Sequence, residues 1–128
     1  MATLNDEMKE MFANKRYAVV GTASKGGIPN AVAMGSPTVL DDATLCFACV
    51  SEGKTFNNLH ENPNVAVTVI DAEVMQQHQI KGKATIETSG PLLDQFKAAM
   101  APHNIVPKCV VKVAISEIYS LRPSKQSK

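Results

Sequence analysis

The sequence predicts a mainly β protein, an antiparallel barrel of about six strands with about three peripheral helices. Two observations carry this prediction. Short extended runs, several of them rich in β-branched residues, follow one another along the chain, and tight turns join most of them. Only three stretches show the spacing of an amphipathic helix. This order favours an antiparallel sheet, because parallel strands need a crossover, usually a helix, between one strand and the next.

The first half of the chain predicts a helix, a hairpin, a third strand and a second helix. Apolar residues share one face of a helix that begins at a cap formed by Thr3 and Asp6 and ends near Asn14; they are Leu4, Met8, Met11 and Phe12. The glycine-rich turn Ser24–Gly27 joins two strands, and Pro37 ends the second of them. The predicted strands span Arg16–Ala23, Asn30–Ser36 and Thr44–Val50, and the second predicted helix spans Lys54–Glu61.

The second half predicts three more strands and a last helix. Asn62 and Pro63 end the second helix, and a β-branched strand follows them. Gly82 indicates a bulge or bend in the next, longer strand. Gly90 and Pro91 open the last helix, whose apolar face carries Leu92, Leu93, Phe96 and Met100. The strands span Val65–Ile70, Gln77–Glu87 and Cys109–Leu121.

Length and composition bound the class of protein. The 128 residues predict one domain, with residues 122–128 as a flexible polar tail. The net charge is +1 and the basic residues are scattered, which argues against a nucleic-acid partner. The apolar runs are too short for a membrane helix, and the N-terminal stretch with Asp6 and Glu7 lacks the apolar core of a secretory signal. Three cysteines without a convincing pair then predict a cytoplasmic protein.

The segment Ala48–Thr55 carries the clearest chemical signal. A predicted strand ends here, and a helix begins at Lys54 after a short loop. The first amides of a helix lack internal partners and lie at the positive end of the helix dipole. Lys54 adds a charge, and Thr55 and Ser51 add hydroxyl groups, so the segment suits a phosphate monoester. A capped helix with a solvated lysine would have the same residues, and this alternative stays open.

The same segment imitates the phosphate loop of nucleoside triphosphate binders. Ala48 stands where the motif GxxxxGK[ST] has its first glycine, and Asp71 follows the strand Val65–Ile70 as in the second motif of such proteins. Their fold needs several parallel strands, each followed by a helix. Only one candidate helix lies between Tyr17 and Glu87, so a nucleotide binder of this kind is the less favoured alternative.

Four features follow one another along the chain. They are the glycine-rich first hairpin, the strand through Gly35-Ser36-Pro37, the helix from Lys54-Thr55 into Asn62-Pro63, and Gly82-Lys83-Ala84 in a long strand. Over residues 4–121 this order resembles the pyridoxamine 5'-phosphate oxidase-like family of FMN-binding split barrels, especially its small single-domain flavoproteins. The resemblance implies a six-stranded antiparallel split barrel that forms a homodimer and binds FMN at the dimer interface.

The resemblance also implies which residues contact FMN. Lys54 and Thr55, aided by Ser51, hold the phosphate. Gln77, five residues before Gly82, matches a glutamine that reaches the flavin in the oxidase branch. The remaining residues match two strands beside the ring and the ribityl chain; they are Ala33, Met34, Gly35, Ser36, Pro37, Cys49 and Val50.

The departures from the family narrow the expected chemistry. The larger oxidases use additional basic residues for the phosphate, and this sequence has Gly53-Lys54 where an arginine-lysine pair could stand. The sequence also lacks the long C-terminal extension of those enzymes. Oxidation of pyridoxamine phosphate is therefore not expected. FMN would supply the electron chemistry, with the protein orienting it. The expected function is an oxidoreductase fed by NAD(P)H or by a protein electron donor, and a non-catalytic electron carrier or storage protein is the alternative.

The cysteines and histidines give simpler predictions. Cys46 and Cys49 form a C-x-x-C motif within a predicted strand, so their side chains point to opposite faces and a core-packing role is expected. Cys109 is also expected in the core. The three histidines show no metal-ligand spacing, so no metal site is predicted. His78 is expected on an exposed face of its strand.

Overall fold

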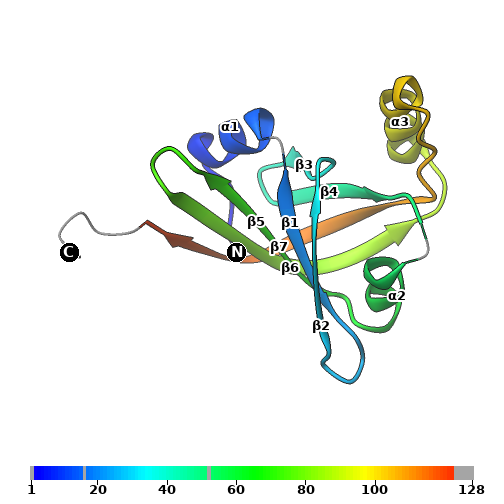
Figure 1. Cartoon of the computed structure of the whole chain (residues 1–128), viewed down its shortest axis with the longest axis horizontal. Helices are drawn as coiled ribbons and strands as arrows, with labels where there is room; N and C mark the ends of the chain where they lie inside the picture. The colour runs from blue at the N-terminus through cyan, green and yellow to red at the C-terminus, as the bar shows by residue number, and fades with distance from the viewer. Residues whose placement is uncertain (1, 16, 52, 123–128) are drawn as a thin grey trace.

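The computed structural model describes residues 2–15, 17–51 and 53–122, and Figure 1 shows the chain. One antiparallel sheet contains every strand, in the order β2-β1-β5-β6-β7-β4-β3. The strands are β1 (Ala18–Ala23), β2 (Pro29–Met34), β3 (Thr38–Asp41), β4 (Thr44–Cys49), β5 (Asn64–Asp71), β6 (Gln76–Glu87) and β7 (Cys109–Leu121). The helices are α1 (Asp6–Asn14), α2 (Lys54–Glu61), α3 (Pro91–Met100) and the short 3-10 helix η1 (Ala101–His103).

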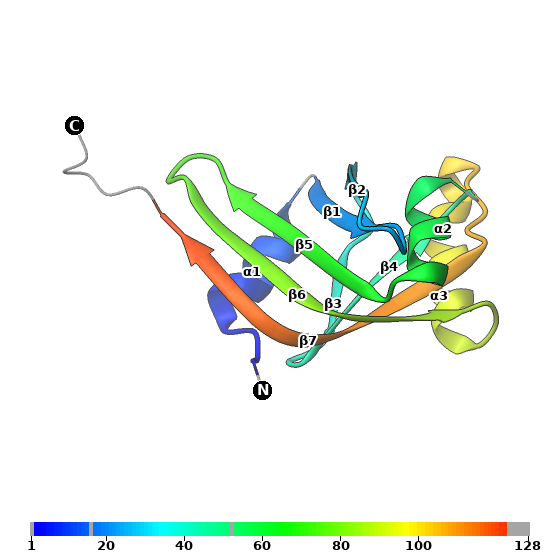
Figure 2. The same cartoon turned by 90° about the horizontal axis from the view of Figure 1, so that it is seen from below.

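The sheet curls into a barrel that stays open along one side. The strands β2 and β3 lie at the two ends of the strand order, so they are the edges of the opening. Figures 1 and 2 show α1 at one end of the molecule and α2 and α3 at the other. The predicted fold class, a mainly β split barrel with three α-helices, is confirmed.

The number of strands differs from the prediction, since the sheet has seven strands where the sequence predicted six. The additional strand is β3, which begins directly after Pro37 and pairs Thr38 with Cys46 of β4. The strand β2 already ends at Met34, two residues earlier than the predicted end at Ser36, and the fixed φ of Pro37 lets a new extended segment follow. A four-residue strand has too short a pattern to be recognised without its partner.

Two other predictions need correction or lie outside the described residues. The N-cap of α1 is Asn5, whose Oδ1 accepts a hydrogen bond of 2.9 Å from the Met8 amide, and not the predicted pair Thr3 and Asp6. The predicted start of the first strand at Arg16, and residues 123–128 of the predicted tail, are not among the described residues.

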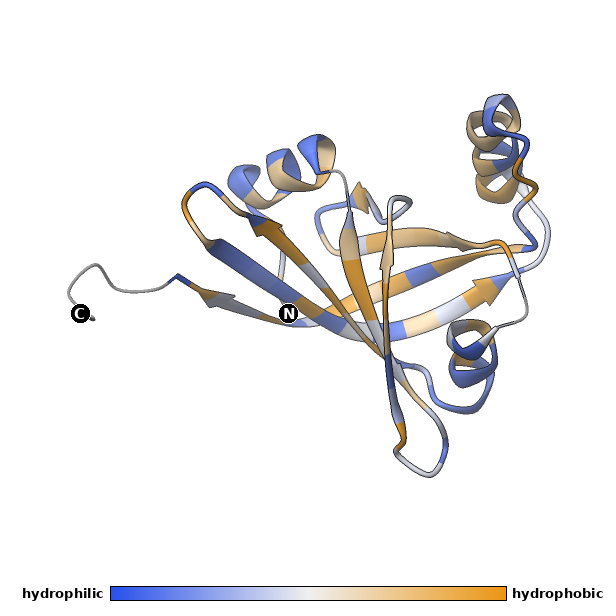
Figure 3. Ribbon diagram, viewed as in Figure 1, coloured by the Kyte–Doolittle hydropathy of each residue, from blue (hydrophilic) through white to orange (hydrophobic). Residues whose placement is uncertain are grey.

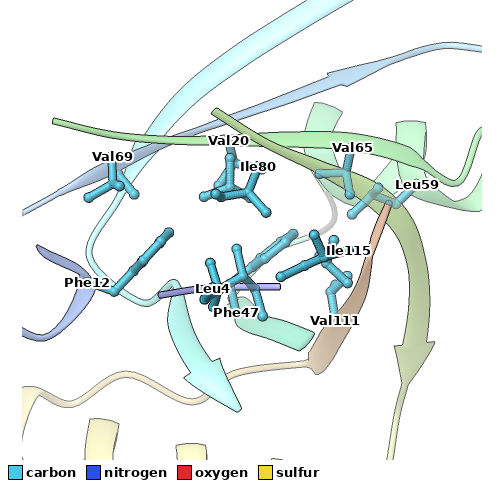
Figure 4. Close-up of a cluster of buried hydrophobic side chains, with 14 of the residues drawn as sticks. Leu4, Phe12, Val20, Phe47, Leu59, Val65, Val69, Ile80, Val111 and Ile115 are labelled. Carbon is cyan, nitrogen blue, oxygen red and sulfur yellow. The ribbon is translucent and has the colours of Figure 1, made fainter. Parts of the chain in front are cut away.

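Hydrophobic side chains from the sheet, the N-terminal segment and α2 fill the barrel. Figure 4 shows them meeting in the interior; those it labels are Leu4, Phe12, Val20, Phe47, Leu59, Val65, Val69, Ile80, Val111 and Ile115. A second, smaller cluster holds α3 against the other face of β4 and β7 through Leu93, Cys46 and Val110. Figure 3 shows the matching pattern along the ribbon, with hydrophobic stretches in β1, β4 and β5 and a hydrophilic first half of β6.

The strand β7 has a bulge opposite Gly82 of β6. The register moves from Lys81 opposite Glu117 to Gly82 opposite Ile115, so Ser116 of β7 is the additional residue. A Cβ atom at position 82 would lie 2.2 Å from the carbonyl oxygen of Ala114, which explains why glycine is needed there. The bulge predicted at Gly82 is confirmed, although the inserted residue belongs to the neighbouring strand.

Within the described residues, no helix combines the length and the apolar character that crossing a membrane would require. Every strand pair in that part of the chain is antiparallel. The alternative fold of a phosphate-loop nucleotide binder, which needs parallel strands, is therefore wrong.

Candidate functional site

The helix α2 begins where the sequence predicted, at Lys54, shortly after β4 ends at Cys49. Its N-cap is Gly53 in an extended conformation, so no side chain of the cap residue covers the first turn. The amides of the first turn point away from the helix, and the helix dipole adds partial positive charge there. Lys54 lies exposed at this end, so charge and amide donors gather at the tip of α2.

Polar contacts hold α2 against the hairpin of β1 and β2. The buried Asn58 donates a hydrogen bond of 3.1 Å from Nδ2 to Oγ1 of Thr22. Asn30 of β2 donates one of 3.3 Å from Nδ2 to Oγ1 of Thr55. Leu59 anchors the same helix in the main core. The tip of α2 is thus fixed relative to β2.

A cavity with a volume of about 920 Å³ lies between β2, the end of β4, the tip of α2, and α3 with η1. Its volume is near the upper end of the range of roughly 300–1,000 Å³ found for small-molecule sites. Most of the sequence-predicted site residues line it: Ala33, Met34, Gly35, Ser36, Cys49, Val50, Ser51, Lys54 and Thr55. The structure therefore brings together predicted residues from three stretches of the chain, which are the end of β2 with the loop after it, the end of β4 with the loop after it, and the first turn of α2.

Two predicted site residues are not among those lining the cavity. Pro37 is fully buried and is not a lining residue. Gln77 lies near the start of β6, opposite Ile70 of β5 and Leu121 of β7, away from the tip of α2. Because side chains alternate along a strand and His78 points inward, Gln77 lies on the outer face of the barrel.

Hydrogen bonds fix the loop between β2 and β3 at the rim of the cavity. Ser36 accepts a hydrogen bond of 3.2 Å at Oγ from the amide of Ala48. Lys15, which follows α1, donates one of 2.9 Å from Nζ to the carbonyl oxygen of Gly35. Burial of the Lys15 ammonium lowers its pKa from the usual value. Residues from both ends of the molecule thus position Gly35 and Ser36.

One wall of the cavity was missed by the sequence analysis. It comes from α3 and η1 and consists of Phe96, Ala99, Met100, His103 and Ile105. The spacing of Phe96, Met100 and His103 puts them on one helical face, so a signal was present. The sequence placed Phe96 and Met100 on an apolar face without distinguishing a ligand wall from the core. Other lining residues, which it did not assign to the flavin site, are Asn30, Ala31, Val32, Thr38, Ala48, Gly53 and Phe56.

The prediction for His78 was wrong, because this side chain is only 3% exposed. Its Nδ1 lies 2.7 Å from Oγ of Ser120, and its Nε2 lies 3.1 Å from Oε1 of Glu7. The ring therefore connects α1 with β6 and β7, and it does not line the cavity. In the described part of the chain, no three His, Cys, Asp or Glu side chains gather as a metal site would require.

The lining of the cavity is polar and positively charged at one end and apolar along the rest. Lys54, Thr55, Ser51 and the first amides of α2 form a positive, donor-rich end, while β2, Val50 and α3 offer apolar surface. Such a site suits a ligand with an anionic group at one end and a flat, largely apolar body.

The chain is similar to several known proteins. MJ0282 of Methanocaldococcus jannaschii is 35% identical over 124 residues, which are 93% of this chain and 81% of that protein. The structure of HupZ from Group A Streptococcus matches with a TM-score of 0.86 and 26% identity, covering 94% of this chain and 96% of that one. An FMN-binding protein of Syntrophomonas wolfei matches in fold, with a TM-score of 0.80, 16% identity, and coverage of 91% and 85%.

The match to a protein family spans nearly the whole described chain. The family model for pyridoxamine 5'-phosphate oxidase covers residues 4–122, from the segment before α1 to the end of β7. This range includes all the residues that line the cavity. The chain therefore belongs to the pyridoxamine 5'-phosphate oxidase family.

Proposed function

We propose that the protein binds FMN in the cavity and acts as an FMN-dependent oxidoreductase. The observation that carries this proposal is the joining of the donor-rich tip of α2 and the apolar strand β2 in one cavity of about 920 Å³. A flavin mononucleotide has the corresponding parts, a phosphate on a flexible chain and a flat ring system. The residues present therefore fit this cofactor.

In this proposal Lys54, Thr55 and Ser51 bind the phosphate, together with the free amides of α2. Cys49 and Val50 lie beside the ribityl chain and the ring. The segment from Ala33 through Met34 and Gly35 to Ser36 follows the ring, and the buried Pro37 fixes the backbone directly after it. When bound, FMN supplies the electron chemistry, and the protein orients it and excludes water.

We also propose that the active form is a homodimer with the cofactor at its interface. The outer face of β1, β2, β5 and β7 exposes apolar side chains; they are Val19, Ala31, Ala33, Ile70, Tyr119 and Leu121. Ala31 and Ala33 also line the cavity, so the cavity borders this face. A second copy docked here would bury the apolar residues, and Gln77 on the same face would then reach the partner's flavin.

A reductant such as NAD(P)H, or a protein electron donor, would deliver electrons in the cytoplasm. The α3 wall favours an enzyme over a carrier, because the cavity continues past the predicted flavin contacts to Phe96, Met100 and His103. A carrier that passes electrons between proteins needs no such space for a second small molecule. The three free, buried cysteines are in keeping with a reducing compartment.

Anaerobic spectroscopy tests this proposal. The purified protein loaded with FMN should show a flavin spectrum, and NADH or NADPH should bleach it within seconds in the enzyme form. A flavin that binds but keeps its colour with both nicotinamides would support the carrier instead. A protein that takes up no flavin would remove the basis of both functions.

A further inference from the structure

Of the two cysteines in the C-x-x-C motif, Cys49 is paired in the structure with Cys109 and not with Cys46. Cys49 of β4 lies directly opposite Cys109 of β7. Both thiols are free, and the residues are 5% and 0% exposed. Both belong to the main core cluster, so they point to the same face of the sheet, whereas Cys46 packs in the separate cluster under α3.

The geometry of this cross-strand pair allows a bond between the sulfurs. Directly opposed residues of an antiparallel pair have Cα atoms about 4.5–5.5 Å apart. This spacing lies within the range of about 4.4–6.8 Å that disulfides span. The amide of Lys108 donates a hydrogen bond of 2.8 Å to the carbonyl oxygen of Cys49, which holds the start of β7 against the end of β4.

The two thiols also interact with each other. Cys49 donates its S–H to the Cys109 sulfur, which lowers the pKa of Cys109 to about 7 although burial opposes this change. The same hydrogen bond, together with burial, raises the pKa of Cys49. The two thiols therefore titrate as a coupled pair, and the reactive form of a cysteine is the thiolate.

Only one of these two residues lines the cavity. It is Cys49, whereas Cys109 on the neighbouring strand is fully buried and is not a lining residue. Cys46 does not line the cavity, and burial raises its pKa to about 11. A small oxidant that enters the cavity thus meets Cys49 first and does not meet Cys46.

We propose that Cys49 and Cys109 are a redox-active thiol pair, which hydrogen peroxide converts into an intramolecular disulfide beside the cavity. The Cys49 proton passes to Cys109, and the Cys49 sulfur attacks one peroxide oxygen, giving a sulfenic acid and hydroxide. The Cys109 thiol then attacks the Cys49 sulfur, and water leaves as the S–S bond forms. The sulfurs lose two electrons, and the peroxide O–O bond gains them.

Thiol counting and peptide mapping test this pair on the purified protein. After mild peroxide treatment and alkylation under denaturing conditions, we expect one free thiol per chain where three were free before, and a mass lower by about 2 Da before alkylation. Cleavage after Phe47 separates Cys46 from Cys49, so the map should show Cys49 joined to Cys109. Three remaining thiols, a bond to Cys46, or a bond between chains would overturn the proposal.

Two variants sharpen the test. Cys46→Ser is the matched control and should still lose both of its remaining thiols to one disulfide. Cys109→Ser should leave the sulfenic acid of Cys49 unresolved, so that a dimedone adduct forms there and in much lower yield in the wild type. Equal adduct yields in the two proteins would contradict the pair. The wild-type peptide map decides the question even where a variant fails to fold.

Discussion

A single glycine fixes the geometry of this barrel where β7 bulges against β6. Gly82 lies at the bulge between β6 and β7, with the backbone oxygen of Ala114 where its Cβ would be. Because that neighbour is backbone, it cannot rotate away as a flexible side chain could. The sequence revealed the special glycine, but not the residue inserted opposite it, since a bulge depends on the pairing of distant strands.

The change Gly82→Ala should lower the free energy of unfolding by more than about 2 kcal/mol, because β7 must move to admit the methyl group. Gly26→Ala is the control, since its new Cβ would meet only Ser24 Oγ at 3.9 Å. This control should stay within about 1 kcal/mol of the wild type. Urea denaturation measures both, and equal stabilities of the two variants would refute the close contact at Gly82.

At the scale of elements, α2 was predicted with its bounds and β3 was missed. Local signals mark both ends of α2, because a Gly-Lys-Thr start and an Asn-Pro stop act within a few residues. The strand β3 depends on its pairing with β4, which a sequence pattern does not show. The register of β6 likewise decides which face of the sheet Gln77 occupies and which face His78 occupies. The position of the cavity wall formed by α3 depends on how that helix packs against the sheet.

The hydrogen bond between Asn58 and Thr22 should fix the position of α2. Asn58→Ala should cost about 1–3 kcal/mol of stability, because it leaves a buried hydroxyl with fewer partners. Thr22→Val supplies the other corner of a double-mutant cycle. Thermal or urea unfolding of the four proteins should give a coupling of about 1 kcal/mol, and strictly additive effects would show that the two side chains act independently.

At the scale of the whole molecule, the open side of the barrel adjoins the exposed apolar outer face of the sheet. The cavity lies beside the edge strand β2, and Ala31 and Ala33 of this strand also belong to the exposed apolar face. A site at such a border is completed by a second copy in our proposal. The sequence alone indicated the dimer only through the family resemblance, because apolar alternation looks the same on an interface and on a core face.

Val19→Glu should weaken the dimer at least about tenfold, because it would bury a charge in the proposed interface while leaving the monomer folded. Val19 is 44% exposed in the single chain. Leu40→Glu on β3 is the control, since its 42% exposed side chain lies at the other edge of the sheet. Light scattering across a dilution series compares the variants, and a monomeric wild type loaded with FMN would disprove the interface.

The central claim is that the tip of α2 binds the phosphate of a flavin, and one titration tests it most directly. The affinities of the wild type and of Lys54→Ala for FMN and for riboflavin are measured by calorimetry, with Lys97→Ala as a control lysine outside the cavity. We expect Lys54→Ala to weaken FMN binding about tenfold, as loss of an exposed charge-assisted hydrogen bond implies, and riboflavin binding far less. An equal loss for both ligands, or a wild type that binds riboflavin as tightly as FMN, would contradict the phosphate site.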